Sequence, residues 1–319
     1  MADKPMDQGG RKRAVNRGDM TAAQWTFKQM RDYKIGYLMI APFMITFAIF
    51  TIVPVLLSIF FSFTFFNLLE WPTFIFLDNY IRLFLDDDVF LLAVMNTLVF
   101  AAVTGPVGYI LSFMMAWFIN ELSPKVRAFI TLIFYAPSIS GQMFLIWQLI
   151  FHNDQYGYAN SLLIRFNIRQ EATLWFNNAD YVMALCIVVA LWLSLGIAFL
   201  AFIAGLNTVD RSYYEAGAVD GVKNRWQELW YITLPLMRNQ LMFGAVMAIT
   251  GAFGFGGVVT ALAGFPSVDY AAHTIMHHLN DYGDIRFEMG YASTIAVLLF
   301  GMMVGANLFI QRLLSKVGT

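Results

Sequence analysis

A polar segment from Asn207 to Asn239 reads NTVDRSYYEAGAVDGVKNRWQELWYITLPLMRN and separates two strongly apolar parts of the chain. Ser212 and Glu215 have the S-x-x-E spacing of a capping box, which predicts a helix that begins at Tyr213. Gly221 stands where that helix should end, because glycine adopts the left-handed C-terminal turn at little cost. The segment is therefore expected to present a short helix between two apolar regions.

The second half of this segment predicts another short helix, from about Lys223 to Tyr231. Pro235 follows, and it favours an extended conformation for the residue before it. Proline is also common at the first position of a helix, so Pro235 is expected to open the next apolar segment.

The composition is that of an integral membrane protein. Hydrophobic residues make up 59% of the 319 residues, charged residues 13%, and the mean hydropathy is +0.62. Soluble domains carry about 25% charged residues. The single cysteine, Cys186, excludes a disulfide within the chain and a thiolate metal cluster. The polar, basic first 35 residues do not resemble a cleavable signal peptide.

Six stretches lack Asp, Glu, Lys and Arg, and each has the roughly 20 residues that a membrane helix needs. They are residues 36–69, 89–120, 128–153, 181–209, 239–268 and 289–311. Backbone groups in lipid must form hydrogen bonds within their own segment, so these spans should be helical. The predicted fold class is an all-α membrane protein with about six transmembrane helices. Prolines 42, 54, 106 and 137 are expected to kink or unwind the first three.

Lys and Arg determine the expected orientation, because cytoplasmic loops carry more of them. With both termini in the cytoplasm, 16 of the 20 lysines and arginines lie inside; the four outside are Arg82, Arg165, Arg169 and Arg286. Residues 1–35 then form a basic cytoplasmic tail, with a surface helix at about 21–34 as one interpretation and a solvated tail as the other. Residues 36–319 form the membrane domain.

The outer loops of this topology are residues 70–88, 154–180 and 269–288. The run from Asp86 to Asp88 is expected to start a helix or to lie at the surface. His273, His277 and His278 are expected to be solvated, because no glutamate follows His273 as it would in a metalloprotease helix. No metal site and no catalytic residues are therefore predicted.

Several motifs resemble those of permease subunits of bacterial ATP-binding-cassette importers. The polar segment matches their cytoplasmic EAA loop through Glu215-Ala216-Gly217, then Gly221, then Ile232-Thr233-Leu234-Pro235. Gly217 replaces the family's second alanine, and the gap before Ile232 is one residue longer. Phe134-Tyr135-Ala136-Pro137, Gly157-x-x-Asn160 and Met289-Gly290-Tyr291-Ala292-Ser293 look like the carbohydrate-uptake branch. The likeness extends over about residues 36–316.

The resemblance implies partners and a division of labour. It implies a second homologous permease subunit, a dimer of ATPase subunits, an external solute-binding protein, and a sugar or oligosaccharide as substrate. The chain would lie in the bacterial inner or plasma membrane, with no nucleic-acid partner. ATP and Mg²⁺ would bind the ATPase, so no cofactor is expected in this chain. The residues implied to couple to the ATPase are Ser212, Tyr214, Glu215, Ala216 and Gly221.

The solute pathway is expected to be lined by neutral polar, aromatic and small side chains. In the family, the segment after Leu-Pro lines the sugar site, and Thr250, Phe253, Gly254 and Gly257 are spaced to share one face of that helix. Other candidates in the apolar segments are Asn96, Tyr135 and Trp147. For any single residue, helix–helix packing is the competing interpretation.

Two other function classes fit less well. An ion-coupled secondary transporter of a small neutral solute is the alternative, but the apolar segments lack the ionisable residues that such transporters keep within the membrane. An intramembrane enzyme would need a nucleophile with a base, or a metal set, and neither is evident. The chain also lacks a Gly-x-x-x-x-Gly-Lys-Ser/Thr phosphate-binding loop. Energy is therefore expected to come from a separate subunit.

Overall fold

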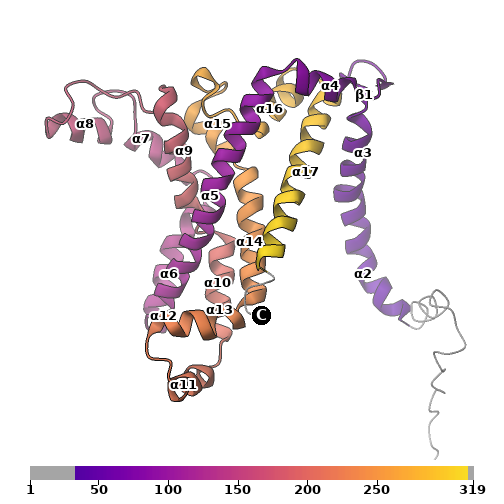
Figure 1. Cartoon of the computed structure of the whole chain (residues 1–319). Coiled ribbons are helices and arrows are strands. Elements are labelled where there is room, and N and C mark those ends of the chain that lie inside the picture. The colour runs from indigo at the N-terminus through magenta and orange to yellow at the C-terminus, as the bar shows by residue number, and fades with distance from the viewer. Residues whose placement is uncertain (1–32, 315–319) are drawn as a thin grey trace, which may run out of the picture. The chain divides into compact units, whose positions relative to one another are not determined.

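The computed structural model describes residues 33–314, so the expected surface helix at 21–34 falls almost wholly outside the described residues. The described chain is helical apart from loops and one two-stranded hairpin (Figure 1). It divides into two compact units, which end and begin at Leu57 and Ser58. The predicted all-α membrane fold is confirmed.

The described part of the first unit is one apolar helical stretch. It consists of α2 (Lys34–Phe47), the π-helical turn η2 (Ala48–Ile52) and α3 (Val53–Phe61), whose last residues belong to the second unit. Pro42 lies inside α2 without ending it, and Pro54 is the second residue after the wide turn. Proline has no N–H to donate and clashes with the preceding turn, which accounts for a wide turn just before Pro54.

The second unit is built around α5 (Asp88–Asn120), which packs against α10 (Ile197–Thr208), α14 (Arg238–Phe253) and α9 (Ala179–Leu193). In Figure 1, α5 runs the length of this unit. One end carries α11 (Arg211–Val219) and α12 (Arg225–Glu228). The other end carries α4 (Asp78–Leu85), α15 (Gly256–Ala263) and α16 (Ile275–Asn280). The helix α17 (Met289–Leu314) completes the bundle against α14 and α16.

Two pairs of consecutive helices meet at sharp bends, one within the predicted span 128–153 and one just before the predicted span 239–268. The helix α6 (Pro124–Ile139) is separated from η3 (Met143–Leu145) and α7 (Ile146–Ile150) by an 88° bend. The helical stretch Arg225–Leu236, which includes η4 (Leu229–Thr233) and α13 (Leu234–Leu236), meets α14 at 83°. Four described helices are long and apolar enough to cross a membrane, or up to six if each bent pair is one span. The expected number of about six agrees with this range.

A small hairpin and three short elements complete the end that carries α4. The strands β1 (Thr64–Phe65) and β2 (Thr73–Phe74) pair antiparallel, with Thr64 opposite Phe74 and Phe65 opposite Thr73. The remaining elements are α8 (Tyr158–Arg165), η5 (Val268–Tyr270) and η6 (Asp281–Ile285). A Cβ on Gly290 would lie 2.1 Å from the Thr64 carbonyl oxygen, so only glycine lets β1 approach the start of α17 this closely.

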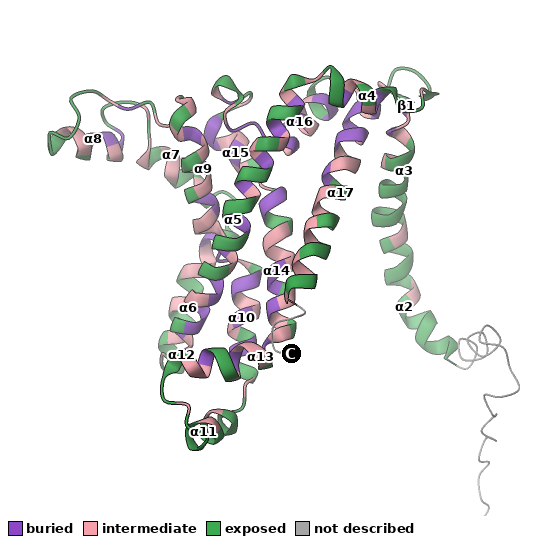
Figure 2. Ribbon diagram, viewed as in Figure 1, coloured by how far each residue is buried: buried purple, intermediate pink, exposed green. Residues whose placement is uncertain are grey.

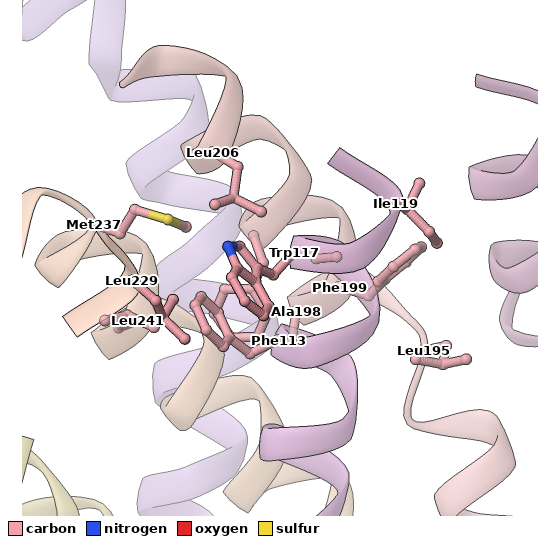
Figure 3. Packing of buried hydrophobic residues seen from close by; sticks show 12 residues of the cluster. Phe113, Trp117, Ile119, Leu195, Ala198, Phe199, Leu206, Leu229, Met237 and Leu241 are labelled. Carbon is pink, nitrogen blue, oxygen red and sulfur yellow. The ribbon is translucent and has the colours of Figure 1, made fainter. Parts of the chain in front are cut away.

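In the second unit, the buried residues lie where helices face one another, and many large apolar side chains elsewhere on the same helices are exposed (Figure 2). Three clusters of buried apolar side chains lie along α5: one at its C-terminal end, one at its N-terminal end and one against α9 and α15. The first cluster packs Trp117 and Phe113 of α5 with Phe199 of α10, Leu229 of η4 and Met237 (Figure 3). This cluster joins the polar segment of residues 207–239 to the membrane helices.

Candidate functional site

The helix α11 is the exposed part of the polar segment. It begins at Arg211, and Asp210 caps it, because the Asp210 side chain accepts a hydrogen bond from the Ser212 N–H at 2.9 Å. This bond also holds the pKa of Asp210 below its ordinary value. The predicted capping box is therefore wrong: Ser212 lies inside the helix, and the Glu215 carboxylate lies 3.3 Å from the Arg211 guanidinium. Asp210 has the extended backbone that a cap requires.

The end of α11 agrees with the prediction at Gly221. Gly221 has φ of +98°, its N–H donates to the Ala218 carbonyl, and the Val222 N–H donates to the Gly217 carbonyl at 2.9 Å. These two bonds make a Schellman motif, which requires the left-handed conformation that glycine adopts readily. Gly217 also allows close packing, because a Cβ there would lie 2.6 Å from Ile232 Cδ1.

The second helix of the segment differs from its prediction. It begins at Arg225 rather than Lys223, because the Asn224 side chain accepts from the Gln227 N–H at 2.9 Å and caps it there. It continues through η4 and past Pro235, so Leu234 is helical, with φ of −60° and ψ of −45°, and not extended. The wide turn of η4 ends at Thr233, two residues before Pro235, and accommodates the missing N–H of that proline. The break falls instead at Met237.

One hydrogen bond attaches α11 to this second helix. The Tyr214 hydroxyl lies 3.0 Å from Thr233 Oγ1, and Thr233 is buried. Tyr214 is half-buried, whereas Ser212, Glu215, Ala216 and Gly221 are exposed. The outer face of α11 is thus open to a partner, while Tyr214 and Gly217 hold its inner face.

A cavity of about 350 Å³ lies between α5, α6, α9, α10 and α14. Hydroxyl-bearing side chains contribute much of its polar wall; they are Thr104, Tyr109, Ser112, Tyr135, Ser138 and Ser194. Its walls hold no Asp, Glu, Lys or Arg. Gly108, on the α5 wall, allows close packing, since a Cβ there would lie 3.0 Å from Ser194 Cβ. The other lining residues are apolar side chains and glycines, so a cavity with these walls suits a neutral solute that offers apolar faces together with hydroxyl groups.

A cluster of polar side chains, Asp87, His278 and Tyr291, lies at the end of α5 that is farther from α11. Asp87 caps α5 by accepting from the Phe90 N–H, and its other oxygen lies 2.9 Å from His278 Nε2 and 2.7 Å from the Tyr291 hydroxyl. Burial by itself would raise the pKa of Asp87, but the hydrogen bonds from His278, Tyr291 and Phe90 hold it well below its ordinary value. The expected helix start within the Asp86–Asp88 run is confirmed at Asp87.

The three neighbouring histidines are buried, not solvated as the sequence suggested. His277 has no exposed surface, and its two ring nitrogens each lie 2.9 Å from a hydroxyl, of Thr260 and Thr274. His273 is 2% exposed and lies among other rings. Burial lowers the pKa of His273 to about 3 and that of His277 to about 4. Within residues 33–314, no group of three or more His, Cys, Asp or Glu is placed to hold a metal ion.

The Gly157-x-x-Asn160 motif has a structural explanation. The Asn160 amide donates to the carbonyls of His152, Asp154 and Thr173, and its oxygen accepts from the Thr173 N–H and Trp175 Nε1. A Cβ on Gly157 would lie 2.5 Å from the His152 carbonyl oxygen. The motif therefore fixes the fold of the loop between α7 and α9.

Comparison with known proteins gives the family. The family model described as "Binding-protein-dependent transport system inner membrane component" matches residues 106–318. The chain belongs to this family. A probable ABC transporter permease protein of Bacillus subtilis, YesP, is 34% identical over 282 residues, which cover 83% of this chain and 85% of that protein. The B. subtilis arabinooligosaccharides transport system permease protein AraP is 28% identical over 280 residues, 87% of each.

The permease fold also agrees with a solved structure. A crystal structure of a bacterial ABC transporter involved in the import of the acidic polysaccharide alginate has a chain with a TM-score of 0.75 to this one. The two chains are 21% identical, and the match covers 92% of this permease and 99% of that chain. The likeness establishes the shared fold.

The seven pathway residues that the sequence predicted for this permease lie in different surroundings in the structure. Tyr135 lines the cavity. The ring of Trp147 instead lies 5.9 Å from that of Phe151 and 5.7 Å from that of Trp192 in α9. The Asn96 amide donates to the carbonyls of Tyr270 and His273. These two side chains make packing contacts with neighbouring elements.

The four candidates after the Leu-Pro motif do not share one helical face, because α14 ends at Phe253 and α15 begins at Gly256. Phe253 is buried among side chains of α5, α16 and α17, while Thr250, Gly254 and Gly257 are exposed. Gly251 and Phe255 contribute to the cavity from this region. Whether any of the seven contacts solute stays a prediction.

Sequence reasoning missed Asp87, His278 and Tyr291 as one group, and Ser112 and Gly251 as cavity residues. A signal existed for Asp87, which lies in the aspartate run before an apolar segment. No comparable signal paired it with His278, because that contact depends on how α16 packs against α5.

Proposed function

We propose that this permease is the membrane-spanning subunit of an ATP-driven importer of a sugar or oligosaccharide, and that it forms half of the solute pathway. The observation that carries the proposal is the combination of an exposed helix, α11, with an uncharged cavity in the same bundle, whose mostly apolar walls include six hydroxyl-bearing residues. The similarity to AraP, an arabinooligosaccharides permease, supports an oligosaccharide as substrate.

The remaining parts of the importer are proposed as separate chains. A second homologous permease completes the pathway, two ATPase subunits hold ATP and Mg²⁺, and a solute-binding protein delivers the solute from outside. A second solved structure of similar fold, a bacterial alginate ABC transporter in complex with an alginate pentasaccharide-bound periplasmic protein, supports the solute-binding protein as a partner. This chain carries out no hydrolysis and resides in the bacterial inner or plasma membrane with both termini in the cytoplasm.

The proposed role of α11 is to dock on the ATPase through Ser212, Glu215 and Ala216, which are exposed. ATP binding and release then favour two different positions of α11. A conformational change of this kind requires that α11 contact the ATPase differently in the two states. Tyr214 and Gly221 keep the helix in a defined orientation on the permease.

Reconstitution tests the proposal. The permease is purified with its co-expressed partners, placed in proteoliposomes and assayed for uptake of labelled oligosaccharides with the binding protein outside and ATP inside. Uptake should require ATP and persist when an ionophore collapses ion gradients. Uptake that continues without ATP but stops with the ionophore would instead support the ion-coupled transporter.

A further inference from the structure

The start of α12 is attached to the end of α5 by side chains. Arg225 donates from Nη2 to a carboxylate oxygen of Glu121, the residue that directly follows α5. It also donates from Nη1 to Glu228 Oε2 at 2.8 Å. Beside this pair, the ring of Trp226 lies 5.2 Å from the ring of Trp117, which is buried in α5. The two helices are therefore held together by a charged contact and an aromatic contact.

The same short helix holds α11. Tyr214 of α11 meets Thr233 of η4, and Ile232 packs against Gly217. The covalent link from α10 to α11, in contrast, passes through Val209 and Asp210, which are extended. A displacement of α11 thus reaches the 225–236 stretch through packed side chains.

The helix α5 extends from this contact to the cavity without interruption. Its 33 residues span about 50 Å. Thr104, Gly108 and Ser112 of α5 line the cavity, and Ser112 lies about 14 Å along the helix from Glu121. Pro106 lies inside α5 between Thr104 and Gly108, whereas the part of the helix from Gly108 to Asn120 contains no proline. This part transmits a displacement of its end along its axis, so movement at Glu121 repositions Gly108 and Ser112.

We infer that Arg225 and Trp226 are positioning residues that transmit the displacement of α11 to α5. The inference rests on the proposed function, and it adds the path by which movement of α11 reaches the cavity within this chain. The Arg225 and Glu121 side chains are 60% and 41% exposed, and an ion pair so exposed contributes little to static stability. Arg225 instead fixes the orientation of α12 relative to the end of α5, because its planar guanidinium holds the carboxylates of Glu228 and Glu121 in fixed directions.

A charge exchange in the assembled importer tests the Arg225–Glu121 contact. All variants carry Glu228→Gln, since otherwise Arg225→Glu would face a second carboxylate within α12. The arms are the Glu228→Gln parent, Arg225→Glu, Glu121→Arg, and both together. The quantity measured is solute imported per ATP hydrolysed in proteoliposomes, alongside complex yield.

Each single exchange should lower solute imported per ATP by about fivefold or more, the range typical of coupling between sites. The double exchange should return within about twofold of the parent, because it restores the pair with its charges reversed. If Arg225 and Glu121 only stabilised the fold, each single exchange would lower complex yield, solute uptake and ATP hydrolysis together. The solute imported per ATP hydrolysed would then stay unchanged. Arg165→Glu, an exposed arginine of α8, is the charge control and should leave the ratio unaltered.

The aromatic contact gives a second, independent test without Glu228→Gln. Trp226→Ala should lower the ratio of uptake to hydrolysis, and Trp226→Phe should retain most of it, since a ring still meets Trp117. Single exchanges with a normal ratio, or a double exchange no better than the singles, would overturn the inference. Absence of ATP-dependent uptake by the unaltered importer would instead contradict the proposed function.

Discussion

His278 Nε2 lies 2.9 Å from Asp87 Oδ2, so two residues 191 positions apart meet at the start of α5. The Tyr291 hydroxyl donates to the same oxygen at 2.7 Å. Asp87 therefore connects α5, α16 and α17 through one partly buried carboxylate. Because hydrogen bonds to a charged group are stronger than neutral ones, this connection should stabilise the fold.

Replacing Asp87 tests that connection. Asp87→Asn keeps a good helix cap but removes the charge, so the apparent free energy of unfolding should fall by about 2 kcal/mol. That corresponds to a decrease of about 3 °C in the melting temperature of the detergent-solubilised protein. Asp86→Asn is the matched control, because Asp86 is exposed, and it should melt like the unaltered protein. Equal melting temperatures for all three proteins would contradict a stabilising role for the network.

Acid should destabilise the permease through its buried histidines. The pKa of His277 is lowered to about 4 in the folded state, below the ordinary unfolded value of about 6.5. The unfolded state then binds more protons between these values, so stability is complete above about pH 6.5 and is lost as the pH falls toward 4. His273, with a pKa of about 3, extends the loss to lower pH. Asp87, whose pKa is also lowered, adds its own loss below about pH 4.

Melting temperatures measured from pH 7.5 to pH 4 test this origin of the acid sensitivity. His277→Gln removes one titrating group, so its melting temperature should fall less steeply with decreasing pH. The exposed His152 provides the control, and His152→Gln should keep the slope of the unaltered protein. An unchanged slope in His277→Gln would show that another group causes the loss.

The hydroxyl of Tyr214 should matter for coupling. Tyr214→Phe removes the bond to Thr233 while keeping the ring, so α11 should lose its fixed orientation on the second helix. Solute-stimulated ATP hydrolysis and uptake should fall severalfold, with complex yield retained. Tyr213→Phe is matched in chemistry, but Tyr213 is exposed, and its activity should be normal. Equal activity in both variants would argue against the Tyr214 contact.

The cavity makes Gly251 a better place than Gly254 or Gly257 to block passage. A Cβ on Gly251 meets nothing within 4 Å, so Gly251→Leu should project into the cavity and reduce uptake of long substrates first. Basal ATP hydrolysis and complex yield should persist. At Gly244, which precedes Gly251 in the same helix, a Cβ would lie 2.2 Å from Phe202 Cζ. Gly244→Leu should therefore lower complex yield and all uptake together; the same pattern in Gly251→Leu would refute the cavity as a passage.

The orientation of the chain is testable by single-cysteine labelling. In a Cys186→Ala background, Gln170→Cys should react with a membrane-impermeant reagent from outside, and Asn224→Cys only from inside. Both positions are exposed in the structure, so reactivity reports sidedness rather than burial. Labelling of both from the same side would contradict cytoplasmic termini.

The sequence by itself determined the all-α membrane class, because long apolar stretches must satisfy their backbone groups as helices in lipid. It also determined the end of α11, since the left-handed turn that ends the helix favours glycine, and Gly221 supplies it. The start of α11 was less determined: Asp210 and Ser212 both have side chains that cap helices, and the extended backbone at Asp210 decided between them.

Only the tertiary structure decided which polar and small residues act together. The spacing of Thr250, Phe253, Gly254 and Gly257 indicated one helical face, but α14 ends at Phe253 and places these residues in different surroundings. The sequence indicated solvated histidines at residues 273–278, yet packing of α16 against α5 and α15 buries them and brings His278 to Asp87. Such contacts form between segments far apart in sequence, so no local pattern of residues specifies them.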